Sequence, residues 1–243
     1  MPNYLIFGAT SAIAIELARL LAKRPATMVL VGRDSQKLAV VAADSTVRQG
    51  KVAGTIAADL ADIPAHDALF AEAERLLGSI DCVVIAHGTL PDPDRADPDY
   101  ALAQFAVNGT SAISLGMRAA QGMERAGAGM IVVIGSVAGE RGRQSNYLYG
   151  AAKGAVNIYF QGLRNRLFHK GIHVLTVKPG FVDTPMTAHL PKNFLFASPS
   201  KVAADVLRAM DNRRDVLFTP WFWRWIMLAV RLVPERIFKK LKL

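Results

Sequence analysis

The stretch FGATSAIA, residues 7–14, decides the fold of this chain because it joins a short apolar run to a helical pattern. The residues from Tyr4 to Gly8 predict a buried strand, and the residues from Ile13 to Arg24 predict a helix directly after it. In such a strand-turn-helix unit, small residues let the backbone approach a pyrophosphate, which the free N–H groups and positive dipole end of the helix stabilise.

This turn has a single glycine. Gly8, Ala12 and Ala14 stand at the three glycine positions of the pattern G-x-x-x-G-x-G, and each alanine adds only one methyl group. Thr10 and Ser11 can cap the helix or contact phosphate. An ordinary strand-helix turn with a hydroxyl cap explains the stretch equally well, so the choice between the two depends on residues elsewhere.

Strand-like and helical segments alternate along the rest of the chain. Further strands are predicted at 27–32, 52–58, 81–86, 129–136, 172–180 and 214–220, and further helices at 35–49, 65–77, about 100–125 and about 146–169. The proline-rich segments 90–99 and 183–200 are expected to be loops. This alternation implies right-handed crossovers and an α/β fold, a single Rossmann-type doubly wound parallel sheet of about seven strands with helices on both faces.

Length and composition fit one cytoplasmic domain. The chain has 243 residues, of which 51% are hydrophobic, and this is enough to bury a sizeable core. No secretory signal is evident at the N-terminus. The single cysteine, Cys82, lies in an apolar run, which predicts a buried thiol and suits a reducing compartment. The five histidines show no ligand spacing with cysteines or carboxylates, so no metal site is expected.

A second stretch, SVAGERGRQSNYLYGAAK at 136–153, supplies the chemistry. Ser136 ends a predicted strand, and Tyr149 follows with Lys153 four residues later. Positions four apart share one face of a helix, so the phenol and the ammonium are expected to face one space. A cation there would lower the pKa of the phenol from its usual value of about 10 and let it exchange protons near neutrality. The neighbouring Tyr147 lacks this spacing.

These motifs resemble those of the short-chain dehydrogenase/reductase family, and the resemblance covers most of the chain. It implies that Asn108, Ser136, Tyr149 and Lys153 are catalytic, with Ser136 holding the substrate oxygen and Asn108 bending its helix to position a water near the lysine. It also implies an adenine contact at Asp59 and a threonine near the nicotinamide at Thr184. The full set of expected cofactor-binding residues is Gly8, Thr10, Ser11, Ala12, Ile13, Arg33, Asp59, Leu60, Gly88, Lys153, Pro179, Gly180, Val182 and Thr184.

The chain departs from the family pattern in two places. The asparagine-rich turn after the fourth strand reads IAHGT, leaving only Gly88 in register, and Ala12 and Ala14 replace glycines. Both changes narrow the cofactor pocket without removing a catalytic group.

The end of the second strand predicts the choice of nicotinamide cofactor. An NAD site usually has a carboxylate there, whereas a 2′-phosphate requires that carboxylate to be absent and an arginine to be near. Gly32 stands at the carboxylate position and Arg33 follows, so NADP(H) is expected. Asp34 is then interpreted as the cap of the next helix.

Residues 221–243 form an amphipathic basic extension to a cofactor-binding and catalytic domain at 1–220. The net charge is +9, yet no nucleic-acid module is present, so nucleic acid is not an expected partner. Arg224, Arg231 and Pro234 interrupt the apolar run before the roughly 20 residues that a spanning helix needs. The three tryptophans and the basic end instead predict a helix lying in the interface of an anionic membrane. The residues are Trp221, Trp223, Trp225, Lys239, Lys240 and Lys242. A dimer contact or a lid over the substrate cleft would also explain the segment.

Within the family, the extension resembles that of reductases acting on decaprenylphosphoryl-2-keto-pentose. This resemblance implies an NADPH-dependent reductase of a lipid-linked or otherwise lipophilic ketone, peripheral on the inner face of the membrane. The family also implies a homo-oligomer, either a dimer or a tetramer. Two alternatives are a reductase of a soluble ketone or 3-oxoacyl substrate and, from another class, a non-catalytic nucleotide-sensing membrane adaptor.

Overall fold

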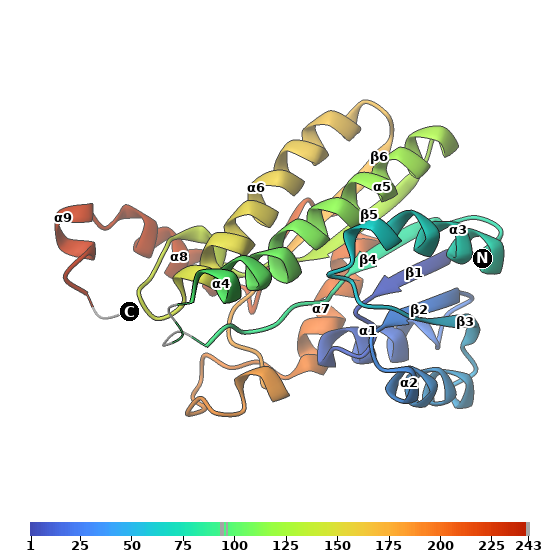
Figure 1. The fold of residues 1–243 in the computed structure, drawn as a ribbon, viewed down its shortest axis with the longest axis horizontal. Helices are drawn as coiled ribbons and strands as arrows, with labels where there is room; N and C mark the ends of the chain where they lie inside the picture. The colour runs from blue at the N-terminus through green and yellow to red at the C-terminus, as the bar shows by residue number, and fades with distance from the viewer. Residues whose placement is uncertain (93–94, 96, 242–243) are drawn as a thin grey trace.

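The core of the protein is a seven-stranded parallel sheet, as the computed structural model shows (Figure 1). The structure describes residues 1–92, 95 and 97–241, so parts of the predicted loop at 90–99 and Lys242 lie outside the described residues. The strand order is β3-β2-β1-β4-β5-β6-β7, which confirms the predicted doubly wound topology. The strands are β1 (Asn3–Phe7), β2 (Thr27–Gly32), β3 (Lys51–Ala57), β4 (Cys82–Ile85), β5 (Gly129–Ile134), β6 (Ile172–Pro179) and β7 (Val216–Thr219).

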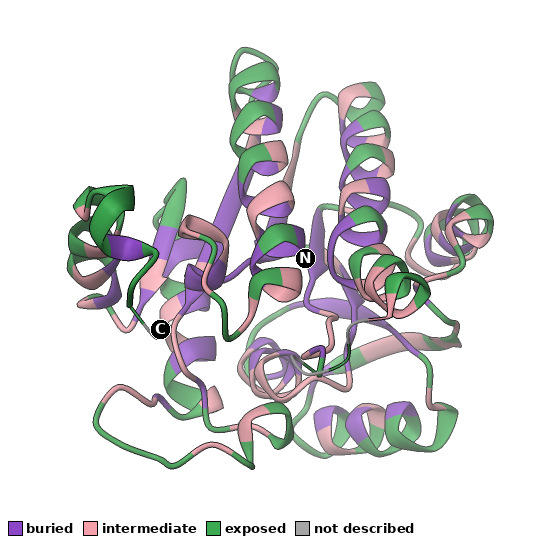
Figure 2. Ribbon diagram, turned by 60° about the vertical axis from the view of Figure 1, so that its left-hand side comes forward, coloured by how far each residue is buried: buried purple, intermediate pink, exposed green. Residues whose placement is uncertain are grey.

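Helices cover both faces of the sheet because successive strand residues point to opposite sides. Ile6 of β1 lies in a core with α1, α2 and α7, and the adjacent Leu5 lies in a second core with α3, α5 and α6. Figure 2 shows the strands buried between helices whose outer faces are exposed. These helices are α1 (Ala12–Leu21), α2 (Ser35–Val47), α7 (Pro199–Asp211), α3 (His66–Leu77), α5 (Ser111–Ala126) and α6 (Tyr147–Phe168).

The predicted helix at about 100–125 is two helices joined by an irregular turn. α4 (Pro98–Phe105) and α5 are separated by a π-helical segment, Ala106–Thr110, and Asn108 lies at its centre. Such π segments bend a helix and often occur at functional sites. The sequence pattern does not predict α7, which follows the second proline-rich loop and packs against α1.

The end of the chain forms two short helices, α8 (Trp223–Leu232) and α9 (Glu235–Phe238). They lie at one end of the molecule, beyond α6 and far from β3 (Figure 1). Within the described residues, no helix is both long and apolar enough to cross a bilayer.

Candidate active site

The turn after β1 lies where the strand order reverses, between β1 and β4, and open α/β sheets bind ligands at such a point. Gly8 has a φ of +74°, and a Cβ on it would lie 2.5 Å from the main-chain nitrogen of His87. The one glycine of this turn therefore stands where the backbone admits no side chain. Ser11 caps α1 by accepting a hydrogen bond from the nitrogen of Ala14 at 3.3 Å, and the Ala14 methyl is buried in the core.

A cavity opens beside this turn and brings together several of the predicted cofactor residues. Its lining includes Gly8, Ser11, Arg33, Asp59, Leu60 and Gly88. The remaining lining residues are Gly32, Ala61, His87, Thr89 and Val107, of which His87 is the only titratable one. Thr10, Ala12 and Ile13 lie in or next to the turn without lining this cavity. Pro179 ends β6, and Gly180, Val182 and Thr184 lie on the loop after it. The cavity suits a nucleotide because its lining combines a helix N-terminus, a cation and a carboxylate.

Arg33 lines this cavity and is exposed to solvent. Its guanidinium makes no ion pair or hydrogen bond with any residue that the structure describes. The adjacent Asp34 accepts a hydrogen bond from the main chain of Lys37 at 3.0 Å and lies 3.5 Å from the Lys37 ammonium. Asp34 therefore caps α2, as the sequence suggests, and leaves the charge of Arg33 available to an anion.

Three of the four predicted catalytic side chains, Ser136, Tyr149 and Lys153, meet where β5 ends and α6 begins. Ser136 follows β5 and accepts a hydrogen bond from the nitrogen of Ala138 at 3.0 Å, which caps the short 3₁₀ helix η3 (Val137–Glu140). Tyr149 and Lys153 lie one turn apart on α6, with the Lys153 Nζ 5.8 Å from the centre of the Tyr149 ring. That ammonium is buried and donates to the carbonyl of Ile134 at 3.0 Å. The four-residue spacing therefore places the Tyr149 phenol and the Lys153 ammonium beside the same space, as the sequence predicts.

The pKa values at this site differ from the sequence-based expectation. Burial raises the pKa of the Tyr149 phenol to about 12, and interaction with the Ser136 hydroxyl opposes this rise. Burial also lowers the pKa of Lys153 to about 8. The expected lowering of the phenol pKa by the lysine is therefore wrong, because desolvation raises this pKa and the opposing contact is with Ser136 rather than with Lys153. A protonated phenol is the form that can donate a proton.

Asn108 connects the π segment to the turn after β4. Its amide donates to the carbonyl of Gln104 at 3.0 Å and to the hydroxyl of Thr89 at 3.1 Å, and its oxygen accepts from the nitrogen of Thr89 at 2.9 Å. A Cβ on Gly88 would lie 2.9 Å from the Asn108 oxygen and 3.6 Å from the Lys153 Nζ. Gly88 therefore lets the asparagine and the lysine approach the same point.

The loop after β6 begins at the predicted Pro179-Gly180 motif. A Cβ on Gly180 would lie 1.9 Å from the indole nitrogen of Trp223, so this position requires glycine. Val182 is buried and forms a bridge with Ala197, and Thr184 begins a short 3₁₀ turn.

A buried carboxylate that the sequence pattern does not reveal supports the segment of Ser136, the predicted catalytic serine. Glu140 accepts from the Lys178 ammonium at 2.7 Å and from the Asn157 amide at 3.2 Å. The same amide donates to the carbonyl of Ser136 at 3.1 Å. These residues come from η3, α6 and β6, and no local spacing relates them.

The C-terminal helix α8 has two apolar faces. Trp223 and Met227 are buried and pack with Val137, Phe181 and Leu195, and Val137 directly follows Ser136 in the sequence. On the opposite face, Trp225, Leu228 and Leu232 are exposed, together with Trp221 before the helix. Because Trp223 is only 4% exposed, it is not available to a membrane, whereas Trp221 and Trp225 are 73% and 58% exposed.

Arg141 holds this extension in place. Its guanidinium donates to the carbonyls of Val230 and Val233 at 2.6 Å each, pairs with Glu235 at 2.8 Å and lies 3.6 Å from the centre of the Phe238 ring. These contacts cap the C-terminal end of α8, where a cation is favourable.

The fold and this site define a nucleotide-dependent oxidoreductase of the Rossmann type. The family model described as short chain dehydrogenase matches residues 3–194. An uncharacterized oxidoreductase of Mycobacterium tuberculosis is 37% identical over 238 residues, covering 97% of this chain and 95% of that protein. The chain belongs to the short-chain dehydrogenase family, whose members use the nucleotide NAD(P)(H).

Two further relatives have more specific names. The ketoacyl reductase HetN of a Nostoc species is 30% identical over 220 residues, covering 86% of this chain and 75% of that protein. A solved structure, the bulky-bulky ketone specific alcohol dehydrogenase from Comamonas testosteroni, has a TM-score of 0.79 at 26% identity and covers 94% of this chain and 91% of its own. Both names refer to oxidoreductases acting on ketones or alcohols.

Proposed function

We propose that the protein is an NADPH-dependent reductase of a lipophilic or lipid-linked ketone, such as a keto-sugar on a polyprenyl phosphate. The reaction type is inferred from Ser136, Tyr149 and Lys153, which lie together at the carboxyl ends of the strands. The Tyr149 phenol has a pKa of about 12 and is therefore protonated at neutral pH. A protonated acid beside a carbonyl favours reduction to the alcohol.

In this proposal, each catalytic side chain has one role. A bound reduced nicotinamide supplies the hydride to the carbonyl carbon. The Ser136 hydroxyl orients the carbonyl oxygen, and the Tyr149 phenol gives that oxygen its proton. The buried Lys153 ammonium stabilises the negative charge left on the phenol oxygen, since its Nζ lies 5.8 Å from the ring centre in a site of low dielectric.

The preference for NADPH is supported by two features at the end of β2. The guanidinium of Arg33 is unpaired within the described part of the chain and lines the nucleotide cavity. Asp34 is engaged in capping α2 and in its contact with Lys37. A 2′-phosphate would find a cation there, with no carboxylate at the Gly32 position and with Asp34 held by its own contacts.

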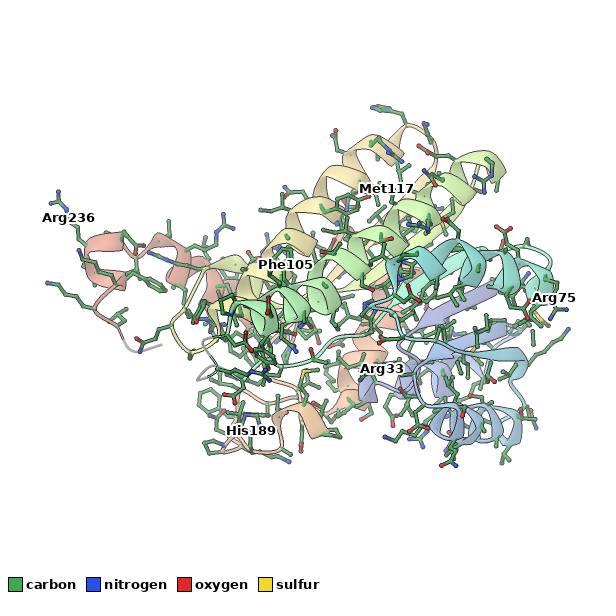
Figure 3. The ribbon with its side chains drawn as sticks, in the orientation of Figure 1. Arg33, Arg75, Phe105, Met117, His189 and Arg236 are labelled. Carbon is green, nitrogen blue, oxygen red and sulfur yellow. The ribbon has the colours of Figure 1, made fainter. Side chains whose placement is uncertain are left out.

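The substrate class is inferred from the exposed face of α8. Trp221, Trp225, Leu228 and Leu232 recur at intervals of three or four residues, and therefore lie on one side of the extension. Four nearby cations make no ion pair within the part of the chain that the structure describes: Arg224, Arg236, Lys239 and Lys240. Figure 3 places Arg236 at the outer end of the molecule.

Exposed aromatic and aliphatic side chains beside unpaired cations match the chemistry of an anionic lipid surface. We therefore propose that the protein acts from the cytoplasm as a peripheral protein on the inner face of the membrane. The opposite face of α8 packs on Val137, next to Ser136, so a bilayer bound to α8 would lie close to the site where the ketone is reduced. Exposed apolar residues on α4–α6, including Leu102, Met117 and Ile158, support a homo-oligomer.

A reductase of a soluble 3-oxoacyl or other ketone substrate is the second candidate, favoured by the name of the Nostoc relative. Vesicle binding separates the two. The intact protein is expected to float with vesicles containing anionic lipid at low salt and to be released at high salt. The double variant Trp225→Gln/Leu232→Gln should lose most of this binding, whereas the matched control Val40→Gln/Val47→Gln, on exposed positions of α2, should retain it.

If the wild-type protein does not bind anionic vesicles, or if the control binds as poorly as the double variant, the proposed lipid surface is wrong.

The chemistry is tested separately by Tyr149→Phe, which should lower turnover by about 10²-fold or more while NADPH still binds. Tyr147→Phe, an exposed phenol on the same helix, is the control and should retain activity.

A further inference from the structure

Glu140, at the end of η3, places a carboxylate inside the protein four residues after Ser136. Its side chain is only 8% exposed. One carboxylate oxygen accepts from the Lys178 ammonium at 2.7 Å and from the Asn157 amide at 3.2 Å, and the other lies 3.5 Å from the Arg231 guanidinium. These three partners belong to β6, α6 and α8. The carboxylate therefore joins three elements to the segment that begins at Ser136.

The Asn157 amide carries this connection to the main chain of Ser136. The amide nitrogen that donates to Glu140 also donates to the carbonyl of Ser136 at 3.1 Å, and Asn157 is buried. One nitrogen thus bridges the carboxylate and the residue that carries the proposed catalytic hydroxyl. A shift of Glu140 changes the direction of the bond to Ser136, and a shift of the Ser136 main chain moves its hydroxyl.

η3 lies directly against the part of α6 that carries the other proposed catalytic groups. A Cβ on Gly139 would lie 2.5 Å from the main-chain carbon of Lys153, so the two backbones are in close contact there. The Ser136 hydroxyl, which caps η3, interacts with the Tyr149 phenol of α6. The relation between this hydroxyl and this phenol therefore depends on how η3 lies on α6.

The ion pair of Glu140 is better suited to fixing a position than to adding stability. Removing two charges from water costs about as much free energy as their attraction returns, so a buried ion pair usually adds little net stability. Charge-assisted hydrogen bonds are, however, short and directional. Lys178 forms no ion pair with another carboxylate of the described residues, and its ammonium lies 5.3 Å from the centre of the Phe218 ring. The lysine therefore holds the carboxylate from a fixed place on β6.

α8 holds the same segment from its other side. Val137, at the start of η3, packs with Trp223 of α8. At the end of η3, Arg231 of α8 lies beside Glu140, and the next residue, Arg141, donates to main-chain carbonyls at the C-terminal end of α8. The C-terminal extension thus contacts the segment after Ser136 at both of its ends.

We infer that Glu140 is a positioning residue that fixes the Ser136 hydroxyl against the Tyr149 phenol, and that Arg231 of α8 belongs to this arrangement. The inference rests on the proposed function in giving Ser136 the role of orienting the substrate carbonyl. Glu140 acts only through Ser136. A displacement of about 1 Å at a reacting group lowers a rate by up to about 10²-fold, so a carboxylate outside the reacting groups affects turnover.

The test variant is Glu140→Gln, which keeps the length of the side chain and an oxygen for Asn157, and removes the negative charge. The first measurement needs no substrate. It follows the ¹³Cζ resonance of Tyr149 in the ligand-free full chain, assigned by its loss in Tyr149→Phe. This resonance should move in Ser136→Ala, because the contact with the phenol is removed, and in Glu140→Gln, because the contact is displaced.

Two further variants complete this measurement. Arg231→Gln should move the Tyr149 resonance in the same direction by a smaller amount, since this guanidinium is largely exposed and lies 3.5 Å from Glu140. The matched control is Glu124→Gln, which should leave the resonance unchanged. Glu124 also pairs with two cations, but it lies on α5 shortly before β5 begins, at the opposite end of this strand from Ser136.

The second measurement is a double-mutant cycle on the NADPH-dependent reduction of 2-decanone, a lipophilic ketone. Glu140→Gln should lower kcat by about 10-fold, with KM and the Kd of NADPH changed by less than about 2-fold. Ser136→Ala should lower kcat by about 10²-fold or more. In the Ser136→Ala background, Glu140→Gln should change kcat by less than about 2-fold, because the group that it positions is already absent. A general structural defect would instead lower kcat by the same factor in both backgrounds.

The inference is overturned by a Tyr149 resonance that does not move in Glu140→Gln or in Ser136→Ala, or that moves as much in Glu124→Gln. A further 10-fold loss of kcat in the Ser136→Ala background would also overturn it. An unmoved resonance in Arg231→Gln alone would overturn the part assigned to α8. If the wild type reduces no 2-decanone, this counts against the proposed function, and the resonance by itself decides the positioning role of Glu140.

Discussion

Replacing Lys153 by methionine is expected to stabilise the protein while removing its activity. Lys153 is only 3% exposed, and burial lowers the pKa of its ammonium from 10.5 to about 8. At about 1.4 kcal/mol for each unit of pKa, the folded state carries a cost of about 3 kcal/mol for keeping this lysine charged. Methionine has a similar length, and losing the hydrogen bond to Ile134 offsets about 1 kcal/mol of the gain.

The net gain at pH 7 is therefore about 2 kcal/mol, or about 4 to 8 °C in the unfolding midpoint of a chain of this size. The gain should depend on pH with a definite sign. Below pH 8 the lysine is charged in both the folded and the unfolded wild type, and the full cost is present. Between pH 8 and 10.5 only the unfolded chain keeps the proton, so the wild type becomes more stable and the advantage of the variant disappears.

Urea unfolding of the ligand-free proteins at pH 7 and pH 10.5 measures this directly. The control is Lys37→Met, on an exposed lysine whose ion pair with Asp34 lies at the surface, where stability should change little. A variant less stable than the wild type at pH 7, or one whose advantage is the same at both pH values, would refute the reasoning. Loss of reductase activity in the stabilised variant would show that the buried charge is retained for function.

Three further predictions follow from single contacts. Gly32→Asp should shift cofactor preference toward NADH in binding titrations, because the new carboxylate would repel a 2′-phosphate. The side chain fits, since a Cβ at this position lies no closer than 3.4 Å to Leu38. An unchanged preference would contradict the NADPH site. Gly180→Ala should lower the free energy of unfolding by at least about 1 to 3 kcal/mol, since its methyl overlaps the Trp223 indole, with a change in tryptophan emission as the second readout. Arg141→Ala should make α8 and α9 sensitive to trypsin while the unfolding midpoint of the core changes little, and a protease-resistant tail would show that the apolar contacts alone hold it.

Local chemistry explains why much of this protein could be predicted from its sequence. Strand and helix periods arise from backbone hydrogen bonding and side-chain direction, which act over a few residues. The order of apolar runs therefore predicts the doubly wound sheet, and the four-residue spacing places Tyr149 and Lys153 on one side of α6. The absence of a carboxylate at Gly32 and the cap at Asp34 are also local features, and the structure places both as expected.

The tertiary structure decided what depends on contacts between distant segments. Trp223 and Trp225 are the same residue type two positions apart, yet one is buried against Phe181 and the other is exposed, because only one face of α8 meets the loop after β6. The rise in the Tyr149 pKa arises from desolvation, which no spacing to Lys153 reveals. His87 lines the cavity beside Gly8 only because β4 lies next to β1 in the sheet. Burial and desolvation sum over the whole fold, and so they are fixed only when the chain is fully packed.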